Sequence, residues 1–187
     1  MGTLSYSTTM SLDGFVEDAD GSFEWFAPSP EIFAAHLERM TEVSTEVLGR
    51  KTFALMQYWE DLPADADVSP DEQEFGRRWR AIKKVVASST LTNADLGNGR
   101  CRLVADLQLP ELARIVSEAE GSVEIFGPTT AGPAMRAGMI DDFHLFVAPK
   151  VLGGGRRALV EGALLDLELV EQRRFDGGTV YLHYRSR

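Results

Sequence analysis

One segment carries most of the information about the fold of this chain: EIFGPTTAGPAMRAGMIDDFHLFVAPKVLGGG, residues 124–155. An apolar strand at 123–126 runs into a turn of small residues and then into a helical stretch. Backbone N–H groups at the start of such a helix are free to bind an anion such as a phosphate. The apolar run at 143–148 is typical of a strand covered on both faces, and it ends near three glycines. The segment indicates half of a nucleotide-binding α/β domain, although any strand-to-helix connection can share this pattern.

Two further strand ends carry side chains that suit a phosphate. The predicted strand at 45–48 leads into GRKT at 49–52, so two cations and a hydroxyl lie at the start of the next helix. The predicted strand that begins at residue 83 ends in three hydroxyl residues at 88–90, which can donate to or accept from a ribose phosphate. Three strand ends in total therefore carry phosphate-compatible chemistry.

The rest of the chain alternates predicted strands with predicted helices. Ser29 and Pro30 indicate a helix start, as N-cap and first helical residue. Two final strands, at 167–175 and 179–184, are joined by Asp-Gly-Gly, which is a strong hairpin signal. The pattern predicts an α/β fold with a mostly parallel central sheet and an antiparallel C-terminal hairpin. Ligands of such sheets bind beyond the carboxyl ends of the strands, where all three phosphate-compatible motifs lie.

Length and composition limit the class of protein. With 187 residues and 44% hydrophobic content, the chain suits a single domain over residues 1–187. The net charge of −10 argues against nucleic acid as a partner. The lone Cys101 excludes an intramolecular disulfide, and the chain shows neither a signal peptide nor an apolar run of about 18 residues. We therefore expect a cytoplasmic protein without a membrane partner, and the histidine spacing predicts no metal site.

The motifs occur in an order that resembles the dihydrofolate reductase family, in particular the reductase half of the bacterial riboflavin-biosynthesis deaminase-reductase. The resemblance rests on SLDGF at 11–15, LGRKTF at 48–53, VVASS at 85–89, FGP at 126–128, GMIDD at 138–142 and VLGGG at 151–155. It implies a three-layer dihydrofolate reductase-like fold, hydride transfer from NADPH to a small heteroaromatic substrate of the pterin or pyrimidine kind, and a homodimer. The deaminase half is not expected, because a lone cysteine cannot supply its zinc site.

The resemblance also assigns the cofactor contacts. It implies that the GRKT turn and the serine pair hold the 2′-phosphate of adenosine, while the turn at 127–131 holds the pyrophosphate. The family usually has a Gly-Gly pair in this turn, often joined by a cis peptide, where this chain has Gly127 and Pro128. Because proline lowers the cost of a cis bond from ~3 to below ~1 kcal/mol, we expect this bond to be cis. The predicted NADPH-binding residues are Gly49, Arg50, Lys51, Thr52, Ser88, Ser89, Gly127, Pro128, Thr129, Thr130, Ala131 and Gly153.

The reaction also needs a proton for the acceptor atom. The resemblance places the loop around Asp13 over the nicotinamide, which makes Asp13 the candidate catalytic residue. The alternative is that Asp13 and Gly14 only form a turn. Folate-reducing relatives carry an acid on the first helix. Glu31 and Glu38 lie in that helix here, but nothing in the sequence matches either one to that position. The sequence therefore does not favour dihydrofolate as the substrate.

The sequence gives fewer indications of which residues line a substrate site. Trp25, Phe26, Tyr58 and Trp59 suit either a flat heteroaromatic ligand or the protein core. His144 lies inside an apolar strand and is expected to be a core residue. Two functions stay open: an NADPH-dependent reductase, and an NADP-binding or regulatory protein that keeps the fold but has lost catalysis. The altered Gly-Pro turn and the unassigned proton donor suggest the second.

Overall fold

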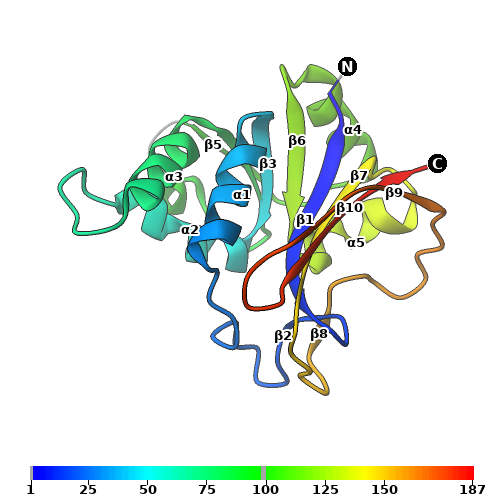
Figure 1. Cartoon of the computed structure of the whole chain (residues 1–187). Coiled ribbons are helices and arrows are strands. Elements are labelled where there is room, and N and C mark those ends of the chain that lie inside the picture. The colour runs from blue at the N-terminus through cyan, green and yellow to red at the C-terminus, as the bar shows by residue number, and fades with distance from the viewer. Residues whose placement is uncertain (1, 98–99) are drawn as a thin grey trace.

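A computed structural model of the chain describes residues 2–97 and 100–187. Eight strands form one central sheet (Figure 1). These strands are β1 Leu4–Ser11, β3 Val43–Gly49, β4 Lys83–Ala87, β5 Cys101–Val104, β6 Ser122–Phe126, β7 Asp142–Ala148, β9 Leu167–Arg174 and β10 Val180–Ser186. Their order across the sheet is β5-β4-β3-β6-β1-β7-β10-β9.

The sheet is mostly parallel, as the alternation of strands and helices predicts. All neighbours from β5 to β7 pair in parallel, and β10 runs antiparallel to both β7 and β9. The predicted C-terminal hairpin is therefore confirmed. The apolar strand β7 is covered on both faces, because Phe143 and Phe146 point to opposite sides and are both fully buried.

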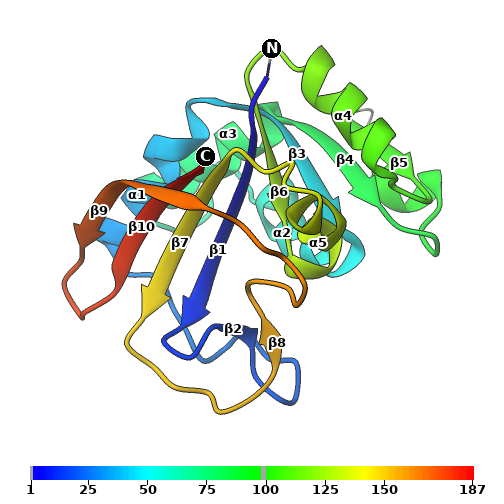
Figure 2. The same cartoon turned by 90° about the vertical axis from the view of Figure 1, so that its right-hand side faces the viewer.

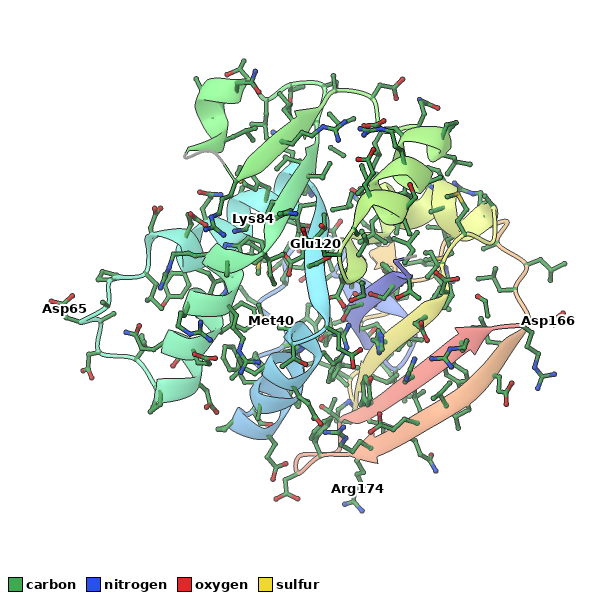
Figure 3. The ribbon with its side chains drawn as sticks, turned by 90° about the horizontal axis from the view of Figure 1, so that it is seen from above. Met40, Asp65, Lys84, Glu120, Asp166 and Arg174 are labelled. Atoms are coloured by element: carbon green, nitrogen blue, oxygen red, sulfur yellow. The ribbon has the colours of Figure 1, made fainter. Side chains whose placement is uncertain are left out.

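Helices cover both faces of the sheet and complete three layers (Figures 1 and 2). One layer holds α1 (Pro30–Met40), α2 (Arg50–Asp61) and α3 (Pro70–Ala81), and the other holds α4 (Leu109–Glu118) and α5 (Pro128–Arg136). Figure 3, viewed from above, shows the sheet between the two layers, with Lys84 and Met40 labelled on the side of α1 and α3. Each layer encloses its own cluster of buried apolar side chains.

Local sequence signals determine where the helices of the first layer begin. Ser29 caps α1 through its side chain, which accepts from the N–H of Ile32, and Pro30 takes the first helical position. The start of α3 has a capping box formed by Ser69 and Glu72. Among the described residues, no helix is long and apolar enough to cross a membrane.

A second, two-stranded ribbon lies beyond the carboxyl ends of β1 and β7 (Figure 2). It pairs β2 (Phe15–Glu17) with β8 (Arg156–Arg157), which no sequence pattern predicts. Gly155 makes the pairing possible, because it has φ +125° and a Cβ there would lie 1.9 Å from the carbonyl oxygen of Glu17. The ribbon thereby holds Arg156 next to Glu17 at the sheet edge where the phosphate-compatible motifs lie.

Candidate active site

A cavity of about 580 Å³ lies at the carboxyl ends of four adjacent strands. Ala87 of β4, Gly49 of β3, Phe126 of β6 and Thr9 of β1 all line it. Val16 and Glu17 of the β2–β8 ribbon form another part of its wall. This is the edge at which parallel α/β sheets bind their ligands.

The N-terminus of α2 faces this cavity. The cavity is lined here by four of the predicted cofactor residues: Gly49, Arg50, Lys51 and Thr52. Gly49 is the N-cap and offers no side chain to the first N–H groups of the helix, so these groups are free for an anion. Packing favours glycine here as well, because a Cβ on Gly49 would lie 2.5 Å from Oγ1 of Thr130, whose side chain would have to shift.

The N-terminus of α5 faces the same cavity from the neighbouring strand β6. Gly127, Pro128, Thr129 and Thr130 line it, and Gly127 is the N-cap. The prediction of a cis bond between Gly127 and Pro128 is wrong, because the described residues contain no cis peptide. The chain turns instead at Gly127, which has φ +81°, and Pro128 fits as the first residue of a helix. We call the turn at residues 127–130 the α5 cradle, and it therefore forms around a trans bond.

Four other predicted cofactor residues do not line the cavity. Ser88 is buried, and its Oγ accepts from the N–H groups of Thr90 and Leu91, each at 3.2 Å. Ser89 is exposed next to it, just beyond the end of β4. Ala131 is buried within α5, and Gly153 is exposed with its N–H directed at Asp13. The structure thus joins the motifs of α2 and α5 and leaves the serine pair outside the cavity.

Both carboxylate oxygens of Asp13 are occupied by hydrogen bonds within the protein. Oδ1 accepts from the Ser11 hydroxyl at 2.6 Å and from the N–H of Leu152 at 3.1 Å, and Oδ2 accepts from the N–H of Gly153 at 2.7 Å. The Ser11 hydroxyl, together with the two N–H groups, lowers the pKa of Asp13 to about 2. Asp13 does not line the cavity. This geometry favours the second interpretation of Asp13, a carboxylate that ties the 11–14 turn to the 150–155 loop.

An arginine that no motif singles out reaches the mouth of the α5 cradle. Nε of Arg156 lies 2.5 Å from Oε1 of Glu17, and its Nη1 donates to Oγ1 of Thr129 at 3.1 Å. Lys51 approaches the same carboxylate, with Nζ 3.7 Å from Oε2. The Glu17 side chain is only 5% exposed, so a buried carboxylate orients Arg156 in this part of the cavity, with the largely exposed Lys51 nearby. These residues are far apart in the sequence, and only an arginine pair after three glycines could have drawn attention to Arg156.

Aromatic side chains form another part of the cavity wall. Phe23, Trp25 and Phe26 line it, and so do Ser7 and the half-buried His36 of α1. Trp25 and Phe26 thus belong to the cavity wall.

The other two aromatic candidates lie outside the cavity. Tyr58 and Trp59 do not line it, and Trp59 packs against Phe33 and Phe75 between the helices. His144, expected to be a core residue, is half-buried and outside the cavity, and its Nδ1 lies 2.8 Å from the Tyr181 hydroxyl. Burial, chiefly, lowers the pKa of His144 to about 2. Within residues 2–97 and 100–187, no cluster of three or more His, Cys, Asp or Glu residues is arranged to hold a metal ion.

Comparison with known proteins places this geometry in a family. An uncharacterized protein of Bacillus subtilis (strain 168), YyaP, is 26% identical over 178 residues, which cover 94% of this chain and 90% of YyaP. The crystal structure of a putative riboflavin biosynthesis protein from Shewanella sp. PV-4 matches with a TM-score of 0.74 at 22% identity, over 99% of both chains.

Dihydrofolate reductase from Enterococcus faecalis, solved with NADP(H), matches with a TM-score of 0.63 at 15% identity, over 100% of this chain and 97% of that one. The fold is therefore dihydrofolate reductase-like. The model of the RibD C-terminal domain family matches residues 3–181. This chain, with its phosphate-compatible cavity at the carboxyl edge of the sheet, belongs to the RibD C-terminal domain family.

Proposed function

We propose that this protein is an NADPH-dependent reductase that transfers a hydride to a small heteroaromatic ring of the pyrimidine or pterin kind. One observation carries the proposal: the N-termini of α2 and α5 open into the same cavity, whose lining also includes the aromatic rings of Phe23, Trp25 and Phe26. A dinucleotide needs phosphate sites together with a site for its reactive ring, and the lining of this cavity combines side chains suited to each. The family membership agrees with a reductase.

The residues at the two helix starts fit the phosphates of NADPH. Three cations line the cavity, Arg50, Lys51 and Arg156, against one carboxylate, Glu17. Arg50 and Lys51 at the start of α2 would hold the 2′-phosphate through charge-assisted hydrogen bonds. The free N–H groups of α5, with Arg156 beside them, would hold the pyrophosphate. Local cations thus favour an anionic cofactor although the whole chain carries a charge of −10.

The rest of the cavity suits the reacting rings. When bound, NADPH supplies the hydride from its nicotinamide ring. Trp25 and Phe26 would exclude water and orient a flat acceptor ring against it. The proton for the acceptor would come from water or from the substrate, because both oxygens of Asp13 are already engaged.

Calorimetric titration with NADPH and with NADH tests the proposal. We expect saturable binding of NADPH and much weaker binding of NADH, because only NADPH offers a 2′-phosphate to the start of α2. A screen for NADPH oxidation against aminopyrimidine ribityl compounds, dihydrofolate and quinones then identifies the acceptor. Failure to bind either nucleotide would contradict the proposed function.

A second candidate function is cofactor binding without catalysis. It is supported by the ion pairs that engage the carboxylate in the cavity lining. Among the described residues that line the cavity, Glu17 is the one carboxylate, and Arg156 and Lys51 engage it. No free acid is therefore available to protonate a bound ring. Tight NADPH binding together with no turnover of any acceptor in the screen would favour this candidate.

We also propose a homodimer built on the C-terminal hairpin. The edge strand β9 exposes Leu169 and Val170 to 44% and 48%, which supports an interface at this sheet edge. Light scattering from the purified protein measures the oligomeric state.

We further propose that the protein works in the cytoplasm. A reducing cytoplasm suits the single, half-buried Cys101.

A further inference from the structure

The end of the cavity next to α1 presents a histidine that the cofactor contacts described above do not use. The His36 ring lies 4.3 Å from the Phe146 ring, centroid to centroid, with 35° between their planes. Phe146 is fully buried in β7. The contact therefore fixes one face of the imidazole against the core while its edge lines the cavity.

The hydrogen-bonding groups of His36 are available to a ligand. Burial, and secondly the nearby Arg39 guanidinium, lowers the pKa of His36 to about 3, so the imidazole is neutral around pH 7. A neutral imidazole offers one N–H donor and one nitrogen acceptor. Within residues 2–97 and 100–187, neither ring nitrogen has a hydrogen-bond partner in the protein.

A hydroxyl with a free hydrogen lines the same end of the cavity. Oγ of Ser7 accepts from Nη1 of Arg39 at 2.8 Å, so its own hydrogen can be donated to a ligand. Arg39 is held from behind by an ion pair with Glu124, whose side chain is only 5% exposed. Since Arg39 lies one helical turn after His36, its guanidinium, paired with Glu124, lies behind both polar groups.

The acids of α1 do not reach this end. Oε2 of Glu31 accepts from the N–H of Asp176 at 3.2 Å, and Oε2 of Glu38 lies 2.9 Å from Nη1 of Arg173. Both carboxylates therefore face the C-terminal hairpin. Glu17 is occupied at the cofactor end by Arg156 and Lys51. Among the described residues that line this end of the cavity, none is a carboxylate, and the Glu124 carboxylate behind Ser7 is engaged by Arg39. A ring that binds as a cation therefore finds no free anionic partner at His36 and Ser7.

We propose that His36 and Ser7 form a subsite for the substrate ring. This subsite selects an uncharged ring over a protonated one, and the ring that it selects carries adjacent donor and acceptor atoms along one edge, as an amide does. The inference rests on the proposed function, since this ring is the hydride acceptor. Ring recognition at His36 can nevertheless be measured without turnover.

Histidine NMR gives the direct test. The chain contains three histidines, so imidazole signals from histidine-labelled protein are few, and a His36→Asn variant assigns one set. The probe is 5,6-diaminouracil, titrated with and without NADPH. We expect a saturable shift of the His36 signals and little change for His144 and His183, which already have the Tyr181 hydroxyl and the Asp142 carboxylate as partners. Unchanged His36 signals throughout the titration would overturn the inference.

Two substitutions test selectivity. His36→Phe keeps an aromatic ring against Phe146 but removes both hydrogen bonds, and should weaken 5,6-diaminouracil binding by roughly tenfold. His36→Asp places a carboxylate in the subsite and should shift preference toward 2,4-diaminopyrimidine, which takes up a proton near neutral pH. Wild-type affinity in His36→Phe, or tighter binding of 2,4-diaminopyrimidine to the wild type, would overturn the inference. Loss of NADPH binding with an intact His36 shift would contradict the reductase function alone.

Discussion

Arg156 and Glu17 are 139 positions apart in the chain, and their ion pair, 2.5 Å from Nε to Oε1, joins the two strands of the β2–β8 ribbon. The same guanidinium reaches Oγ1 of Thr129 in the first turn of α5. The ribbon and the α5 cradle are thus connected through one side chain. Glu17 keeps Arg156 oriented toward the site that we assign to the pyrophosphate.

Arg156→Ala should weaken NADPH and NADH to the same degree, because the pyrophosphate is common to both. One hydrogen bond to a charged group is worth ~1.5–3 kcal/mol, so we expect a loss of roughly tenfold or more in each affinity. Calorimetric titration of both nucleotides measures it. A loss confined to NADPH would place Arg156 at the 2′-phosphate instead.

Arg50→Ala should weaken NADPH by roughly tenfold or more and leave NADH nearly unchanged, because it removes a charge-assisted contact to the 2′-phosphate. The matched control is Arg77→Ala, which removes an exposed arginine paired with Glu74 on α3, outside the cavity. The control should bind NADPH like the wild type. Equal losses for the two nucleotides in Arg50→Ala would refute the 2′-phosphate assignment.

Asp13→Asn should make the protein less stable at neutral pH, because the amide cannot accept both backbone N–H groups as the carboxylate does. The folded-state pKa of Asp13 is about 2, below the ordinary 3.8, so its stabilising effect is complete above pH 3.8 and is lost as pH falls through about 2. Denaturation midpoints of the two proteins should therefore converge in that interval. If the difference between the midpoints persists down to pH 2, Asp13 ionisation is not its cause.

The same Asp13→Asn variant separates the two interpretations of this residue. If Asp13 only ties the turn together, turnover of an identified acceptor should stay within a few-fold of the wild-type value. Loss of a positioned general acid would instead cost ~10²- to 10⁴-fold in rate. A loss of that size with unchanged NADPH affinity would restore Asp13 as the proton donor.

Gly155→Ala should destabilise the protein by at least about 1–3 kcal/mol, since the alanine would need φ +125° and would overlap the carbonyl of Glu17. Gly154→Ala is the matched control, because a Cβ there meets no atom within 4 Å and the change should stay within about 0.5 kcal/mol. Urea denaturation measures both. A neutral Gly155→Ala would show that the ribbon does not need this close approach.

The amino-acid sequence by itself determined the order and type of most elements. The Ser29 cap before Pro30 and the Asp-Gly-Gly hairpin turn act through neighbouring backbone groups, so their effect can be read locally. The apolar run of β7 likewise predicted a strand buried on both faces. Glycine at the starts of α2 and α5, with two cations at the start of α2, indicated phosphate-compatible sites, because helix starts leave N–H groups free.

Only the tertiary structure decided which side chains share the cavity. His36 and Glu38 lie on the same helix, yet the first lines the cavity and the second pairs with the hairpin. The direction of a side chain around a helix is set by which layer the helix packs against, and spacing along the chain does not contain that information. The Arg156–Glu17 pair has the same origin. It depends on two segments far apart in sequence meeting in the folded chain.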